Sequence, residues 1–233
     1  MMRAEEIDEM RLLALFKNVP DEHVDIMLRA SFLQRFPAHV ELVREGDPPD
    51  FLHVVVSGQV EVFSAYRDRE TTVAVLEPGQ SFIVAAVLLD RVYLKSARAL
   101  SAARVLMIPA ELVRRYFAED AIFARSLAVE LALAYRGVVR ELKNQKLRSN
   151  LERLANWLIA HQAESGGASR ITLPFDKKVL ASRLGMAPEI LSRSFAALLP
   201  YQVRVKGPEI EIGDLAALRT LAKPTSTIDD PTI

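Results

Sequence analysis

The spacing of apolar residues changes twice along the chain, near residue 32 and near residue 110. Between these points, from Phe32 to about Pro109, short runs of β-branched and aromatic residues alternate with turn residues. Val60 and Val62, separated by a polar residue, show the period of two that is typical of a half-buried strand. Short strands at regular spacing, with turn signals such as Ser57-Gly58, predict a small antiparallel β jelly roll.

Helical periodicity dominates the rest of the chain. Residues 1–30 are predicted to form two short helices, the second of which begins after Pro20. A long helix is predicted from about Ala121 toward Leu147, because apolar residues recur there every three or four positions: Phe123, Leu127, Leu131, Ala134, Val138 and Leu142. This stripe resembles a coiled-coil seam and favours a homodimer. Packing of the same stripe on the β domain of its own chain is the alternative.

The region from Asp176 to Leu199 has the pattern of a helix–turn–helix. Leu180 and Leu184 share one face of a first helix that begins after Asp176. Gly185 suits the left-handed residue that ends this helix, and Pro188 suits the first turn of the next one. Two helices joined by so short a turn are typical of proteins that place the second helix in the major groove. A helical hairpin that binds nothing is the alternative, because such patterns are degenerate.

Two short strands, at 203–206 and 209–212, flank Gly207-Pro208 and predict a β-hairpin wing after this motif. The predicted fold class is therefore α+β. The predicted domains are a β-roll sensor domain over 1–120, a long dimerisation helix over 121–148, a winged helix–turn–helix domain over 149–222 and a flexible polar tail over 223–233.

Composition narrows the classes of function. The 233 residues have zero formal net charge, so a basic surface for nucleic acid must be local. The chain has no cysteine, which excludes disulfides and cysteine-ligated clusters and suits the cytoplasm. We expect neither a signal peptide nor a membrane span, because the first residues alternate acidic, basic and apolar types and no apolar run approaches membrane length. We find no nucleophile–base pair, metal-binding spacing or phosphate loop, so neither a catalytic nor a metal site is expected.

The order of β-roll, long helix and winged helix–turn–helix resembles the Crp/Fnr superfamily of bacterial transcription regulators. The segment EGDPPDFLHVVVSGQVEV, from Glu45 to Val62, is similar to the signature of its cyclic-nucleotide-binding domain. The resemblance implies a homodimer that binds palindromic double-stranded DNA under control of an effector in the roll. It also implies RNA polymerase as a candidate partner, and no association with a membrane.

The effector site departs from the cyclic-AMP-binding pattern of the family. Ile83-Val84 stands where a Gly-Glu pair meets the ribose, and Lys95-Ser96 stands where an Arg-Ser pair meets the phosphate. Lysine cannot form the bidentate fork of arginine, and a ribose hydroxyl without the carboxylate would lose its partner. The family's adenine-contacting position falls near Val138. We therefore do not expect cyclic AMP as the effector.

The remaining candidate pocket is apolar: Phe82, Ile83, Val84, Ala85, Ala86 and Val87, with Lys95, Ser96 and Val138 around it. One interpretation is that these residues only fill the core of the roll. Another is a pocket for a flat apolar ligand such as haem, which some relatives use to sense gases. Haem needs an axial ligand, and no histidine lies in this segment or on the long helix. The cofactor stays open, and a constitutive DNA-binding protein with a structural roll is a further alternative.

The second helix of the motif carries the candidate base-reading residues. The order Glu189, Ser192, Arg193 resembles the fumarate–nitrate regulator branch, which reads half-sites of the TTGAT type. Arginine can pair with guanine, and glutamate can accept from the amino group of cytosine. The candidate phosphate contacts, each of which could equally be an ordinary surface lysine, are Lys177, Lys178 and Lys206.

Overall fold

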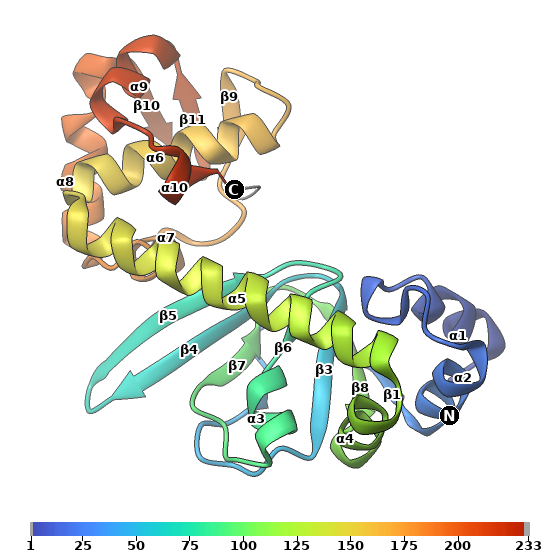
Figure 1. The fold of residues 1–233 in the computed structure, drawn as a ribbon. Helices are drawn as coiled ribbons and strands as arrows, with labels where there is room; N and C mark the ends of the chain where they lie inside the picture. The colour runs from blue at the N-terminus through green and yellow to red at the C-terminus, as the bar shows by residue number, and fades with distance from the viewer. Residues whose placement is uncertain (1, 231–233) are drawn as a thin grey trace. The chain divides into compact units, whose positions relative to one another are not determined.

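The computed structural model describes residues 2–230 (Figure 1). The chain separates into two compact units, and the division falls between Ala134 and Tyr135, inside the long helix. Each unit has its own buried core of apolar side chains.

The first unit contains eight strands in two antiparallel sheets. The strands are β1 (Phe32–Phe36), β2 (Glu41–Val43), β3 (Phe51–Ser57), β4 (Val60–Tyr66), β5 (Arg69–Leu76), β6 (Ser81–Phe82), β7 (Ser96–Ala99) and β8 (Ala103–Pro109). One sheet has the order β1-β8-β3-β6 and the other has the order β2-β7-β4-β5. The antiparallel roll predicted from the sequence is therefore confirmed.

Side-chain alternation along the strands fills the space between the two sheets. Val55 and Val105 from one sheet share a core with Val60 and Val62 from the other, together with Phe82. Val60 and Val62, which show a period of two in the sequence, thus lie on the face of β4 that points into this core.

The turn between β3 and β4 requires glycine. Gly58 has φ +78°, and a Cβ at this position would lie 2.3 Å from the carbonyl oxygen of Ala102. No side chain fits at that distance, so the turn signal at Ser57-Gly58 reflects a close approach of two backbone segments.

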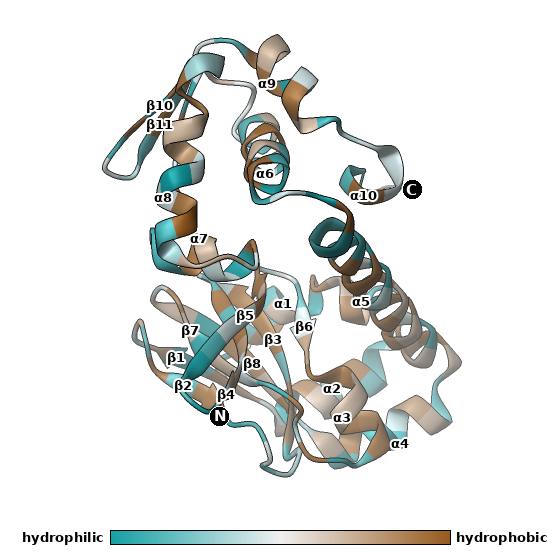
Figure 2. Cartoon of the chain, turned by 90° about the vertical axis from the view of Figure 1, so that its left-hand side faces the viewer, coloured by the Kyte–Doolittle hydropathy of each residue, from teal (hydrophilic) through white to brown (hydrophobic). Residues whose placement is uncertain are grey.

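Helices cover the outer face of the β1-β8-β3-β6 sheet. They are α1 (Ala4–Arg11), the 3₁₀ turn η1 (Ala14–Phe16), α2 (Asp21–Ala30), α3 (Val84–Leu89), α4 (Ala110–Glu119) and the first part of α5 (Ala121–Leu147). Leu52 and Val54 of β3 belong to the core beneath these helices. Figure 2 shows that α3 is hydrophobic along its length.

The first half of α5 packs on the core of its own unit. Phe123 and Leu127 are fully buried there, and Leu131 packs against the same core. Val138 and Leu142, which continue the predicted stripe in the second unit, are exposed. The alternative that this stripe packs on its own β domain therefore holds for its first half, and these residues are not free to form a dimer seam.

The second unit is a winged helix–turn–helix domain, as predicted. Its elements are α6 (Asn150–Glu164), β9 (Arg170–Thr172), α7 (Lys177–Arg183), α8 (Pro188–Ala197), the 3₁₀ turn η2 (Leu199–Tyr201), β10 (Val203–Lys206), β11 (Glu209–Ile212), α9 (Leu215–Ala222) and α10 (Ser226–Asp229). The strands form an antiparallel sheet of order β10-β11-β9. Leu154, Leu158, Leu180 and Phe195 lie in its core.

The segment after α9 differs from the flexible tail predicted for residues 223–233. Within the described residues it contains α10 and forms hydrogen bonds to the C-terminal end of α5. The physical reason is charge, because Asp229 forms an ion pair with Arg148, the first residue after α5. Residues 231–233 of the predicted tail lie outside the described residues.

Candidate nucleic-acid interface and effector site

The turn before α8 is built as the sequence predicts. Asp176 occupies the N-cap position of α7, although its side chain accepts no capping hydrogen bond. Gly185 has φ +63°, which is the left-handed conformation expected of it. Pro188 is the first residue of α8, where its missing N–H has no intrahelical partner to lose. These positions fix where α8 begins and which of its faces is exposed.

The three candidate base-reading side chains lie on the solvent-facing side of α8. Glu189, Ser192 and Arg193 are all exposed, whereas Leu191 and Phe195 are buried in the domain core. Positions three and four apart are neighbours on a helix, so the three side chains form one continuous surface. Within residues 2–230, Arg193 donates one long hydrogen bond of 3.4 Å, from Nε to the carbonyl oxygen of Glu189, which leaves its terminal nitrogens available.

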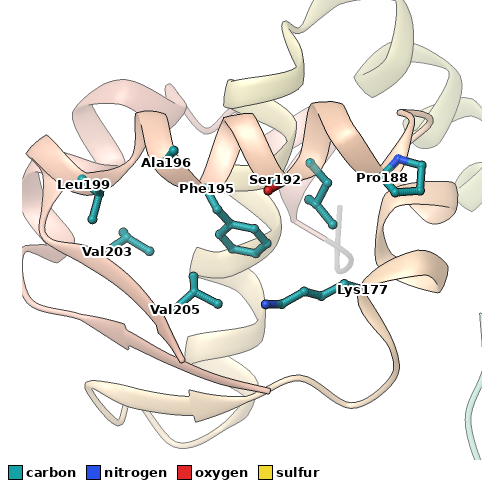
Figure 3. A pocket seen from close by; sticks show the side chains of 9 residues that line it. Lys177, Pro188, Ser192, Phe195, Ala196, Leu199, Val203 and Val205 are labelled. Atoms are coloured by element: carbon teal, nitrogen blue, oxygen red, sulfur yellow. The ribbon is translucent and has the colours of Figure 1, made fainter. Parts of the chain in front are cut away.

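A groove of about 280 Å³ lies beside this surface, between α8 and β10 (Figure 3). Its walls include Ser192, Ala196 and Val205, and Lys177 reaches into it from the start of α7. The Lys177 ammonium lies 5.9 Å from the ring centroid of Phe195, a distance at which a cation–π interaction holds it in place. The structure thus brings Lys177 and Ser192 together at one groove.

The other two candidate phosphate contacts are separate from this groove. Lys178 is exposed on α7, and Lys206 is exposed at the end of β10, next to the Gly207-Pro208 turn of the wing. Neither residue lines the groove. The predicted set therefore comprises one lysine at the groove and two on surrounding surfaces.

Arg153 on α6 is a residue that the sequence reasoning missed. Its guanidinium is largely buried and donates to the carbonyl oxygens of Leu184, Gly185 and Arg148, at 2.8, 3.4 and 2.9 Å. Burial lowers the pKa of Arg153. This side chain connects the residues just after α5 to the turn before α8. Its place among other basic residues, such as Lys146 and Arg148, hid it, because lysine and arginine side chains usually lie in solvent.

The apolar segment around α3 is used mainly for packing. Phe82, Ile83 and Ala86 pack in or against the core between the sheets, while Val84 and Val87 belong to the core beneath the helices. Ala85 is exposed. Ile83 has φ +67°, a strained conformation for a β-branched residue. It occurs where the cyclic-AMP-binding pattern has glycine.

The polar members of the candidate pocket differ in their surroundings. Ser96 is buried and its hydroxyl accepts a hydrogen bond from the N–H of Glu45, at 2.9 Å. Lys95 is partly buried, which lowers its pKa. Val138 belongs to the second unit and is exposed.

Two titratable groups in the first unit were not identified as site residues. His53 on β3 is 2% exposed and stacks on Phe82 with ring centroids 5.1 Å apart. Its Nδ1 has no hydrogen-bond partner among the described residues, and burial lowers its pKa to about 4. Glu130 on α5 accepts a hydrogen bond from Ser81, and burial raises its pKa to about 7. Glu130 is the one charged residue between Ser126 and Tyr135. Its position in this otherwise apolar run is the sequence feature that could have marked it as buried.

Residues 2–230 contain neither a membrane-spanning helix nor a cluster of metal-binding side chains. No helix there is both long and apolar enough to cross a membrane. The same part of the chain contains no group of three histidine or carboxylate side chains that could hold a metal ion.

Two family models match the two units. One, described as a cyclic nucleotide-binding domain, matches residues 33–120, and the other, described as a Crp-like helix-turn-helix domain, matches residues 152–221. The CRP-like cAMP-activated global transcriptional regulator of Mycobacterium tuberculosis is 22% identical over 194 residues, which are 81% of this chain and 87% of that protein.

Solved structures share the fold over most of the chain. A regulatory protein from Silicibacter pomeroyi DSS-3 is 29% identical with a TM-score of 0.60, over 93% of this chain and 100% of that one. FixK2 from Bradyrhizobium japonicum is 20% identical with a TM-score of 0.72, over 84% of this chain and 98% of that one. With both domains matched in the same order, the chain belongs to the Crp/Fnr family, whose members are transcription regulators and not enzymes.

Proposed function

We propose that this regulator binds a palindromic DNA operator as a homodimer, under control of an effector other than cyclic AMP in the β-roll. The observation that carries the proposal is the exposed row of Glu189, Ser192 and Arg193 on α8, beside the groove that Lys177 enters. An operator of this kind implies the bacterial cytoplasm as the place of action. Two half-sites about one helical turn apart would match a two-fold dimer.

The chemistry of this row favours half-sites of the TTGAT type. Arg193 can donate two hydrogen bonds to O6 and N7 of guanine, and Glu189 can accept from the amino group of the cytosine in the opposite strand. Ser192 can donate to a base or a phosphate. Lys177, Lys178 and Lys206 supply charge for the backbone, which orients the domain without reading sequence.

The composition of the α3 segment argues against cyclic AMP as the effector. The relative from Mycobacterium tuberculosis is named as cAMP-activated, but here Ile83-Val84 offers no carboxylate to a ribose hydroxyl. Buried polar groups of a ligand need partners, and each missing partner costs about 1–3 kcal/mol. An apolar effector suits this segment better than a nucleotide does.

A second candidate function is constitutive DNA binding with a purely structural roll. The observation that favours it is the packing of Phe82, Val84 and Val87 into cores of their own unit. A native mass spectrum of the gently purified protein separates the two candidates. An additional bound mass supports an effector, and a mass equal to the polypeptide alone supports the structural roll.

If α8 reads the bases, substitutions of a base-contacting residue and of a phosphate-contacting residue should have different effects on DNA binding. Arg193→Ala should lose about 1–3 kcal/mol of discrimination between a TTGAT-type palindrome and a scrambled sequence, because a bidentate base contact is removed. Lys206→Ala should weaken binding to both sequences equally, because a phosphate contact is the same everywhere. Fluorescence anisotropy with the two duplexes at several salt concentrations measures both effects.

Glu164→Ala serves as the control, because Glu164 is exposed at the far end of α6 and should leave both affinities unchanged. Equal losses on both duplexes for Arg193→Ala would show that this residue contacts backbone only, and would refute the proposed base contact.

A further inference from the structure

The C-terminal strap, defined as residues Pro224–Asp230, lies beyond the matched helix–turn–helix domain, which ends at residue 221. It is nevertheless anchored to the domain at its start. Asn156 of α6 donates to the carbonyl oxygen of Ala222 at 2.7 Å, and the Lys223 ammonium lies 3.7 Å from the Glu152 carboxylate. The strap therefore leaves the domain from a fixed position on α6.

From this origin the strap contacts the end of α5 at three points. Arg148, one residue beyond α5, donates from both terminal nitrogens to the two carboxylate oxygens of Asp229, at 2.7 and 2.5 Å. Lys143 donates to the hydroxyl of Thr227 at 2.8 Å, and Arg140 donates to a backbone carbonyl oxygen of the strap at 3.2 Å. These contacts cover two turns of the helix. All of them lie within the second unit, and Figure 2 shows α10 beside the end of α5.

The Arg148–Asp229 pair has the geometry of a strong interaction. The side chain of Arg148 is 7% exposed, so few water molecules reach its guanidinium, and the carboxylate of Asp229 compensates its charge. Asp229 also accepts from the N–H of Thr225 at 2.6 Å, which closes the turn of α10 around the same carboxylate. Bidentate arginine–carboxylate pairs are both stronger and more directional than single hydrogen bonds.

Arg148 also connects the strap to the turn before α8. Its carbonyl oxygen accepts from Arg153, and Arg153 donates further to Leu184 and Gly185. A continuous series of hydrogen bonds thus runs from Asp229 through Arg148 and Arg153 to the turn before α8.

We propose that the C-terminal strap is a conformational brace, which fixes the joint between the end of α5 and the DNA-binding domain. With the strap in place, α8 has one orientation relative to the end of α5. Without it, the joint at Arg148 and Ser149 relies on Arg153 and on the capping interaction of Ser149 with Glu152. The consequence for operator recognition rests on the proposed function, because a fixed α8 limits the half-site spacings that a dimer accepts.

Hydrogen exchange tests the brace without DNA. Asp229→Asn, which removes the charge from the pair, should speed amide exchange in residues 143–149 and 224–230 by about tenfold in the full-length protein. Glu164→Gln carries the same charge change on an exposed side chain of the same domain and should leave these amides unchanged. The exchanged pair Arg148→Asp with Asp229→Arg should restore part of the protection. Unchanged exchange in Asp229→Asn would overturn the brace.

Binding to operators with altered half-site spacing tests whether the strap affects operator recognition. Wild-type protein should prefer the best spacing over one that is a base pair longer, and Asp229→Asn should reduce this preference by about fivefold or more. Faster exchange with an unchanged spacing preference would overturn the role of the strap in recognition. If wild-type protein binds no palindrome at all, the proposed function fails, whereas the exchange result still decides whether the brace exists.

Discussion

Glu130 is a carboxyl group held in an environment that favours its neutral form. It lies on the part of α5 that packs on the first unit, it is bonded to Ser81 of β6, and burial raises its pKa to about 7. In the unfolded chain the same group titrates near its ordinary value of about 4.3. As the pH rises between these two pKa values, Glu130 loses its proton in the unfolded chain but keeps it in the folded protein, so ionisation favours unfolding. The contribution of Glu130 to stability is therefore full at low pH and is lost as pH rises toward 7.

Glu130→Gln should remove this dependence, because the amide keeps a polar partner for Ser81 but does not ionise. Relative to the wild type, the variant should be similar at pH 5 and more stable at pH 8 by about 1–2 kcal/mol, a value reduced for partial exposure. Urea unfolding followed by circular dichroism at the two pH values measures the difference.

His53 also makes stability depend on pH, but it does not disturb the comparison of Glu130→Gln with the wild type. Its pKa is lowered to about 4, so its contribution is present above pH 6.5 and is lost as pH falls toward 4, which is the opposite sign. Both proteins in the comparison contain His53, and its effect cancels. A stability difference between Glu130→Gln and wild type that does not change with pH would contradict the assigned pKa of Glu130.

At the residue scale the sequence could predict exposure on α8 but not these buried groups. Glu189, Ser192 and Arg193 follow from helical spacing, since Leu191 and Phe195 define the opposite face. The burial of Glu130 and His53 depends on which distant strand lies against them. Periodicity along one segment contains no information about that partner.

At the scale of elements, the sequence predicts where helices and strands lie better than it predicts which elements pack together. The wing strands fall at 203–206 and 209–212 as predicted, because Gly207-Pro208 marks the turn and the alternation on each side is regular. The long helix was also predicted, but the sequence left its partner open between a second helix and the roll of its own chain. Phe123 and Leu127 could face a second helix or a β-roll with the same apolar pattern.

The turn of the helix–turn–helix gives the element-scale prediction. Gly185→Ala should destabilise the second unit by about 1–2 kcal/mol, because alanine is unfavourable at φ +63°. The new Cβ would also lie 3.2 Å from the side chain of Gln145. Trp157 is the only tryptophan and lies in this unit, so urea unfolding followed by its fluorescence reports the effect.

Gly137→Ala is the matched control for that substitution. Gly137 lies inside α5, and a Cβ there would meet nothing within 4 Å. Alanine in a helix interior is more favourable than glycine by about 0.5–1 kcal/mol, so this variant should be unchanged or slightly stabilised. Loss of stability in both variants, or in neither, would contradict the special conformation of Gly185.

At the scale of the whole molecule, the order of the two domains was the strongest sequence signal. A zero net charge did not suggest a DNA-binding protein, but a β-roll followed by a long helix and a wing is an unusual combination. The effector remained open for a physical reason. The apolar residues around α3 are equally suited to filling a core and to enclosing an apolar ligand, and in this structure most of them pack in cores of the first unit.

The proposed homodimer is the remaining whole-molecule property, and the exposed residues of α5 indicate which surface would form it. Ile122, Val129 and Leu133 are exposed on the first part of this helix. Val129 and Leu133 lie two positions after Leu127 and Leu131, which corresponds to about 200° around a helix, so they face away from the core of their own unit. Ile122, Ser126, Val129 and Leu133 follow the 4-3-4 spacing of a coiled-coil seam. The first part of α5 therefore has one apolar face against its own roll and a second, exposed one, where we expect another copy of the chain to pack.

Leu133→Glu should convert the dimer into a monomer, because a charge at the centre of a helical seam weakens association by about 100-fold or more. Leu12→Glu places the same charge on another exposed leucine and should leave the assembly intact. Sedimentation velocity distinguishes the 26.0 kDa chain from its dimer. The monomer should also lose affinity for the palindrome while keeping that for a single half-site, since α8 is unchanged. A Leu133→Glu protein that sediments as the wild-type dimer would exclude this face of α5 as the interface.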